Sequence, residues 1–261
     1  MGNLSIAVPL SGHWQNSYGS TLDLSVSENG NLIGKYASTT GASGTYPVLG
    51  QCQTNASGSG IGLVLGISWR ALDDTKTAPT YNNTWHWVST YCGQLTTSGN
   101  LSVINSLVGT TAFGDTSKGD YVDKLSFDRL SDANAFDQSW ACAGDKVDNL
   151  LNGYWLLPSG DCALELEVVS DYGLVQGKVV FANKSDLAVQ GFTDTQTPLS
   201  GETPWRQSVT FNVCSDTQIL SFSGYLDISL NQLILTCWQA YGTAPGDEYL
   251  QASATAYNFV R

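Results

Sequence analysis

Polar side chains that can donate hydrogen bonds alternate along the stretch GHWQNSYGSTLDLSV at residues 12–26. Trp14, Asn16 and Ser20 share one parity with the leucines that follow, and residues of one parity point to the same face of a strand. If that face is buried, an amide and a hydroxyl lie inside a core, where an unpartnered polar group costs about 1–3 kcal/mol. Two interpretations follow: these side chains cap a local turn, or they bind a ligand.

Side chains that could catalyse a reaction or hold a metal ion are few and scattered. The chain has two histidines, His13 and His86. His13 has the opposite parity to Trp14 and is therefore expected to face outward. The sequence contains no G-x-S-x-G nucleophile motif and no Cys-x-x-Cys pair. We therefore predict that the protein is not an enzyme and holds no metal.

Short strands must position the polar side chains, and their pattern occurs twice. Residues 12–36 and 153–179 share a Gly-x-Trp opening, three alternating apolar residues, a turn and a Gly-Lys pair. Further along, STYCGQL (89–95) corresponds to LSFSGYL (220–226). A period near half the chain length indicates two copies of one domain. Frequent turn signals between short alternating strands favour an up-and-down barrel or a sandwich.

The two copies define the expected domain boundaries. We place the first copy at residues 5–131 and the second at residues 151–261. The segment between them, residues 132–150 (SDANAFDQSWACAGDKVDN), is polar and lacks strand alternation. It is therefore predicted to be a linker.

Composition excludes several classes of partner. The 261-residue chain has a net charge of −12, and only 13% of its residues are charged. This acidic balance argues against nucleic-acid partners and anionic membrane surfaces, which require clustered Lys and Arg, and no apolar run has transmembrane length. The N-terminal sequence shows no signal peptide, which predicts an intracellular protein and leaves secretion open. The six cysteines permit disulfides but settle neither their presence nor their pairing.

Four motifs of the first copy occur in an order that resembles the avidin and streptavidin family of biotin-binding proteins. They are Gly-x-Trp-x-Asn…Gly-Ser, GKYAST, GISWR and STYCGQL. The resemblance covers nearly all of the first copy, whereas the second copy shares only the framework. It implies an all-β chain with two tandem eight-stranded antiparallel up-and-down β-barrels, each with a ligand site at its mouth.

The resemblance also implies a ligand site in the first copy. Asn16, Ser20 and Tyr36 match three family residues that donate hydrogen bonds to the ureido oxygen of biotin, an arrangement similar to an oxyanion site. Trp69 and Tyr91 match aromatic walls of the family's pocket. The ligand-binding residues implied for this copy are Asn16, Tyr18, Ser20, Tyr36, Ser38, Thr40, Trp69, Ser89 and Tyr91.

The first copy also departs from the family. The second wall Trp on the seventh strand matches Val108, and the Asp or Asn on the last strand matches Leu125. Asp123 could replace that acceptor only in a different register. The Trp that family members lend to a neighbouring subunit falls near Ser117. The copy therefore keeps the carbonyl-binding end and loses part of the apolar box.

The second copy shows the reverse pattern. It keeps candidate aromatic walls at Phe222, Trp238 and Tyr249. At the positions of the family's polar contacts it has other side chains: Leu157, Asp161 or Cys162, and Val179. Without those hydrogen bonds, this copy is expected to bind biotin weakly.

The sequence thus predicts a non-catalytic protein that binds a small ring compound with a carbonyl group. Biotin and an organic chromophore such as an indolone pigment both fit, and no other cofactor is implied. A carbohydrate-binding or protein-interaction module, using exposed aromatic residues and the polar stretch 72–83, is one alternative. A barrel enzyme such as a cyclase is another. For assembly, we expect either a homodimer or an intrachain pseudo-dimer of the two barrels.

Overall fold

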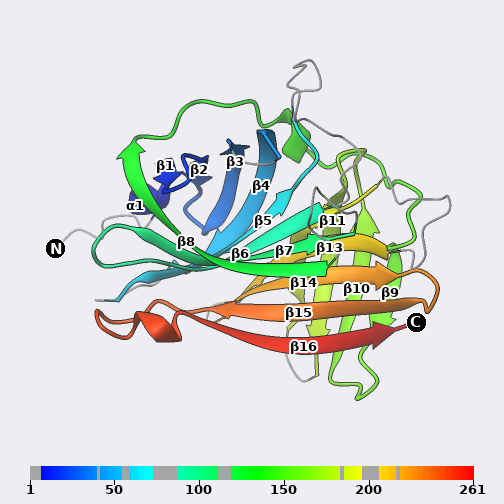
Figure 1. Ribbon diagram of the computed structural model, residues 1–261. Helices are drawn as coiled ribbons and strands as arrows, with labels where there is room; N and C mark the ends of the chain where they lie inside the picture. Colours follow the sequence, from blue (N-terminus) through cyan, green and yellow to red (C-terminus); the bar gives the residue numbers. More distant parts are fainter. Residues whose placement is uncertain are drawn as a thin grey trace.

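Two closed eight-stranded antiparallel barrels make up the molecule, which confirms the fold predicted from the sequence. Figure 1 shows the barrels side by side, the first coloured blue to green and the second green to red. Among the described residues, no helix is long and apolar enough to cross a membrane. The computed structural model describes residues 7–39, 42–54, 59–72, 87–110, 119–182, 185–195, 206–215 and 218–261.

The first barrel is a meander in which each strand pairs with the next and β8 closes on β1. A short helix, α1 (Ala7–Leu10), precedes it. Side chains alternate along each strand, so one parity gathers in the interior and the other faces outward. The strands are β1 (Gly12–Asn16), β2 (Thr21–Val26), β3 (Asn31–Ser38), β4 (Gly44–Cys52), β5 (Ile61–Ser68), β6 (Trp87–Leu95), β7 (Leu101–Gly109) and β8 (Gly119–Ser131).

The second barrel repeats this topology, with β16 closing on β9. The 3-10 turn η1 (Ser139–Ala141) precedes the second barrel, and the 3-10 turn η2 (Glu248–Leu250) precedes its last strand, β16. The strands are β9 (Gly153–Leu156), β10 (Cys162–Val168), β11 (Leu174–Phe181), β12 (Leu187–Thr193), β13 (Arg206–Cys214), β14 (Ile219–Asp227), β15 (Gln232–Ala240) and β16 (Ala252–Val260).

The repeated Leu-x-Gly-x-Trp motif closes one end of each barrel in the same way. In the first barrel, Trp14 Nε1 donates a hydrogen bond to the carbonyl oxygen of Leu10 at 3.2 Å. In the second, Trp155 Nε1 donates to the carbonyl oxygen of Leu151 at 2.9 Å. All four side chains are fully buried, so each indole fills the core while its only polar group is satisfied.

The barrels pack against each other within one chain. Strand β6 contacts β13, and β14 contacts β5. Since β13 and β14 correspond to β5 and β6, the two contacts are equivalent when the barrels are exchanged. The interface is therefore close to isologous, as in a two-fold dimer. It holds buried polar contacts: Thr90 Oγ1 lies 2.6 Å from Thr210 Oγ1, and Asn212 Nδ2 donates to the Leu49 carbonyl oxygen at 3.0 Å. The structure thus contains the pseudo-dimer that the sequence left as one of two alternatives.

The linker contributes to this interface as well as connecting the barrels. Trp140 is buried in a cluster with Leu49 of β4 and Phe192 of β12. Its ring lies 6.0 Å from that of Phe192, and its Nε1 donates to the Asp137 carbonyl oxygen at 3.0 Å. The polar composition of this segment did not reveal the role of its one tryptophan, which has no periodic neighbours to mark it as core.

Candidate functional site

The turn between β1 and β2 fixes the buried amide of Asn16. Its Oδ1 accepts hydrogen bonds from the backbone N–H of Tyr18 at 3.1 Å and of Ser20 at 3.0 Å. The turn-capping interpretation is therefore correct for this oxygen. Neither bond uses the Nδ2 group, so the turn also holds the amide rigidly while leaving its two N–H donors for another partner.

The end of β3 lies against the same turn. The backbone N–H of Thr39 donates to Ser20 Oγ at 3.4 Å, and Thr39 Oγ1 donates to the Tyr18 carbonyl oxygen at 3.2 Å. Ser20 and Ser38 are both buried. Thr40, also predicted to bind the ligand, lies outside the described residues. The structure thus brings the hydroxyls of Ser20, directly before β2, and of Ser38, at the end of β3, to the Asn16 end of the barrel.

Aromatic rings from β3, from β6 and from Trp69, directly after β5, meet inside the barrel. The Tyr36 ring lies edge-on to Trp69 at 6.0 Å and to Tyr91 at 6.1 Å. Trp69 Nε1 donates to Ser89 Oγ at 2.9 Å. This bond holds the indole in place, because it satisfies the polar atom of an otherwise apolar ring. Four predicted site residues, Tyr36, Trp69, Ser89 and Tyr91, therefore form one connected cluster.

The Tyr91 hydroxyl is the most strongly perturbed titratable group in this cluster. Burial, above all, raises its pKa well above the ordinary value, and the Tyr36 hydroxyl, to which it is hydrogen-bonded, and Asp123 raise it further. Both desolvation and a nearby negative charge disfavour the phenolate. Tyr91 therefore stays protonated and neutral, and acts as a hydrogen-bonding wall.

Sequence reasoning missed two rings of this cluster, Tyr46 and Trp87. Tyr46 lies 4.8 Å from Trp69, and Trp87 lies 6.0 Å from the same ring. The Tyr46 hydroxyl donates to the Ala42 carbonyl oxygen at 3.0 Å. Parity would have found Trp87, because it alternates with Ser89 and Tyr91 along β6.

The comparison with known families agrees with this geometry. Residues 5–113 match the family model described as the Avidin family. The first barrel is an avidin-family domain. The match ends before β8 begins, so the second barrel shares its fold and strand order without being part of the match. No curated protein matches the chain.

Strand register corrects one predicted departure of the avidin-family barrel. Val108 does not occupy the position of the missing wall Trp, because β7 turns its odd-numbered residues inward. Leu101 and Val103 belong to the buried cluster, and Leu107 packs against it. On β8 the predicted Leu125 does lie in that cluster, and Asp123 has the same parity at the exposed end of the strand. Both therefore face the lumen, at different depths.

Two other predicted contacts lie outside the barrel interiors. Trp238 was expected to wall the second barrel, but β15 turns Leu235 and Cys237 inward and Trp238 outward. Its Nε1 donates to Ser223 Oγ at 3.0 Å. The wall assignment was therefore wrong: the aromatic residue was matched to a family position without regard to which face of the strand it occupies.

The second of these contacts is Tyr18 of the avidin-family barrel, which is 59% exposed on the β1–β2 turn.

The second barrel has an apolar interior at the matching positions. Phe222 faces inward as predicted, but it stacks on Phe211 at 5.0 Å and lies 6.1 Å from Tyr257. Tyr249, the third candidate wall, is 79% exposed in the β15–β16 connection and is not a wall of the lumen. By strand register, the pairs of corresponding residues are Asn16 and Leu157, Ser20 and Cys162, Tyr36 and Val179, Ser38 and Phe181, Ser89 and Leu220, Tyr91 and Phe222.

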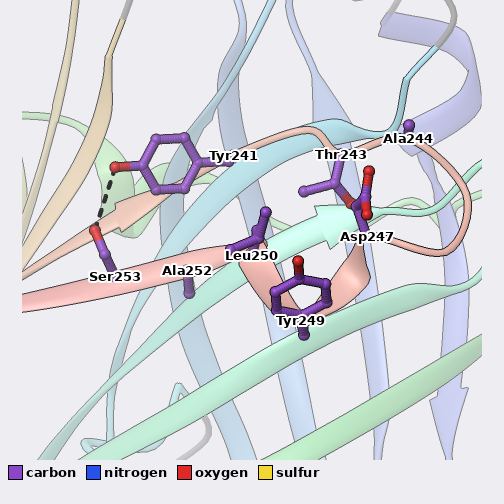
Figure 2. Close-up of a pocket in the computed structure, with 8 residues that line it drawn as sticks. All are labelled: Tyr241, Thr243, Ala244, Asp247, Tyr249, Leu250, Ala252 and Ser253. Carbon is purple, nitrogen blue, oxygen red and sulfur yellow. Dashed lines mark hydrogen bonds between the residues drawn. The ribbon is translucent and has the colours of Figure 1, made fainter.

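A groove lined by the β15–β16 connection of the second barrel is a separate feature (Figure 2). It encloses about 530 Å³ beside the β15–β16 connection. Among its lining residues, the Tyr241 hydroxyl lies 3.3 Å from Ser253 Oγ. Its lining residues are Tyr241, Thr243, Ala244, Asp247, Tyr249, Leu250, Ala252 and Ser253.

Proposed function

We propose that the first barrel binds a small, flat ring compound through a carbonyl group and does so without catalysis. Biotin is one candidate, and a conjugated ketone such as an indolone pigment is another. One observation supports the proposal: the Tyr36 ring lies beside the Trp69 and Tyr91 rings in a barrel that also buries the polar side chains of Asn16 and Ser20. These groups bind a carbonyl oxygen well and transfer protons poorly at neutral pH.

Direct detection of a ligand is the first experiment. Native mass spectrometry of the purified protein, with an absorbance spectrum of the same sample, identifies a retained compound and its chemical class. Calorimetric titrations with biotin and with oxindole follow. Binding of a carbonyl ring compound with one ligand per chain supports the proposal, and the absence of any binding contradicts it.

Variants then test whether the ligand occupies the predicted site. Asn16→Asp keeps an oxygen for the two turn bonds and replaces the Nδ2 donor with an acceptor, so the turn is retained and the ligand carbonyl is repelled. Tyr36→Phe removes one hydroxyl. Each change is expected to weaken binding by about 1–3 kcal/mol. Val179→Ala, at the position in the second barrel that corresponds to Tyr36, is the matched control and should leave the affinity unchanged.

The surface groove supports a second candidate function, carbohydrate binding. Tyr241 and Tyr249 present exposed rings, and Asp247 adds a carboxylate that can accept sugar hydroxyls. A glycan array with the wild-type protein and with Tyr249→Ala tests it. Reproducible binding that the variant loses would favour this function for the second barrel, and an array without signal would exclude it.

A further inference from the structure

Asn105 stands at the centre of a polar row inside the first barrel. In strand register it lies beside Tyr91 on β6 and beside Asp123 on β8. Directly opposite residues on one face of an antiparallel pair have their side chains in contact range. All three share the lumen-facing parity, because Asn105 is two residues from Val103, which lies in the buried cluster, and Tyr91 and Asp123 are opposite Asn105 on the neighbouring strands.

The Asn105 side chain carries an acceptor without a partner. Its Oδ1 is buried, and no group in the described part of the chain donates a hydrogen bond to it. A folded protein seldom leaves such an atom unpaired, because it gives up hydration and receives nothing in return. The corresponding residue of the second barrel is Cys237, whose thiol has no comparable need for a donor.

Asn105 also faces the donor groups across the lumen. Strand β7 lies four strands from β3 in the eight-stranded ring, so Asn105 and Tyr36 are on opposite walls. A flat ligand whose carbonyl oxygen accepts from Tyr36 and Asn16 therefore presents its far edge to Asn105.

We propose that Asn105 is the second polar anchor of this site and selects ligands that carry an O–H or N–H donor on the edge opposite the carbonyl. The inference rests on the proposed function and narrows its ligand class. In this proposal, the Asn105 side chain gives that wall of the site a hydrogen-bond acceptor in place of an apolar surface. The carboxylate of Asp123, next in the row, reinforces the choice, since a negative charge favours a donor edge and opposes an anionic one.

A matched pair of fluorescent probes tests the proposal. In 7-hydroxycoumarin the lactone carbonyl and a hydroxyl lie at opposite ends of a flat two-ring system, and 7-methoxycoumarin lacks the donor. Wild-type protein, studied at a pH where the hydroxyl is protonated, should bind the hydroxy compound at least about tenfold more tightly. Asn105→Leu should abolish that preference while it retains binding of the methoxy compound. Cys237→Ala, at the corresponding position of the second barrel, should keep the preference.

Three outcomes are distinguishable. Equal binding of the two coumarins by the wild type, or a preference that survives in Asn105→Leu, overturns the role of Asn105 and leaves the proposed function standing. If the wild type binds no coumarin, no biotin and no oxindole, the proposed function fails and the inference fails with it.

A second measurement needs no ligand, so its result does not depend on whether Asn105→Leu changes the shape of the site. Because Asn105→Leu removes an unpaired acceptor, the empty variant should unfold at a higher urea concentration than the wild type. A lower midpoint for both Asn105→Leu and Asn105→Ala would show that the amide serves the fold, and would overturn the proposal.

Discussion

The two barrels share a scaffold and differ in what lines it. Both close one end with a tryptophan bonded to a carbonyl four residues earlier, and both surround it with buried aliphatic side chains. Near the other end, the first barrel has amides and hydroxyls where the second has leucine, valine, phenylalanine and cysteine. The deep layer therefore holds the fold, and the layer near the mouth is free to vary.

The difference in lining suggests that the interior of one barrel serves ligand binding and that of the other serves stability. Phe211 and Phe222 stack inside the second barrel, where apolar side chains contribute to stability and replace the donors that Asn16, Ser20 and Tyr36 provide in the first barrel. The first barrel keeps an unpaired acceptor at Asn105, which costs stability and suits a ligand. We infer that the second barrel supports the first through the interface and that the first carries the site.

The largest expected effect tests the shared scaffold. Trp14→Ala and Trp155→Ala each remove a fully buried indole, and each should lower the free energy of unfolding by about 3–5 kcal/mol. The Arg261 guanidinium, 4.2 Å from the Trp155 ring, should make the second change slightly larger. Urea unfolding measures both. The exposed Tyr249→Ala is the control, and a large loss for only one of the two tryptophans would contradict a common scaffold.

The sequence predicted the parts of this fold that depend on periodicity. Alternation along 12–36 and its repeat at 153–179 indicated two β-domains, each a barrel or a sandwich, because one buried face per strand produces that pattern. The family resemblance then selected the eight-stranded barrel, which the structure confirms. The resemblance placed Tyr36 and Trp69 in one cluster, as the structure has them.

Residues whose role depends on pairing between strands were less accessible. Val108 and Trp238 were assigned to the lumen by their match to family positions, and the register turns both outward. Asn105 was missed because its significance lies in an unpaired oxygen. A single sequence records neither register nor satisfaction of hydrogen bonds, since both depend on residues distant in the chain.

Alkaline pH should act on the two buried thiols of the second lumen, as it does on the buried Cys52 thiol of the first. Burial raises the pKa of Cys162 from 9.0 to about 11 and that of Cys237 from 9.0 to about 12, and the Cys162 thiol adds to the second shift. Above pH 9.0 the unfolded chain therefore loses protons that the folded chain retains. The free energy of unfolding should fall as pH rises, by up to about 1.4 kcal/mol per pH unit for each thiol.

Cysteine variants test which thiols cause this fall in the free energy of unfolding. Urea unfolding of Cys162→Ala and Cys237→Ala, under reducing conditions, should show a flatter alkaline decline than the wild type. Cys142→Ala, at an exposed position, should leave the decline unchanged. Identical slopes in all four proteins would show that Cys162 and Cys237 do not control alkaline stability.

A smaller effect is expected at the interface that joins the barrels. Thr90 Oγ1 lies 2.6 Å from Thr210 Oγ1 and 3.3 Å from Ser221 Oγ. Thr90→Val or Thr210→Val alone leaves a buried hydroxyl unpaired and should cost about 1–3 kcal/mol. The double variant should cost less than the sum, with a coupling energy of about 0.5–3 kcal/mol in unfolding measurements. Additive costs would mean that the barrels are not coupled through this contact, and Thr90→Ser should remain close to wild type.

The smallest effect concerns the charge at the mouth of the first barrel. Asp123 lies in the lumen-facing row, and its Oδ1 accepts from the Lys124 backbone N–H at 2.7 Å. The corresponding residue in the second barrel is the uncharged Thr255. An anionic ligand tail near this carboxylate is disfavoured, so biotinamide should bind a few-fold more tightly than biotin at low salt. Asp123→Asn keeps the bond to Lys124, removes the charge and should abolish the difference. A preference that is independent of salt and survives in Asp123→Asn would place the ligand tail away from this carboxylate.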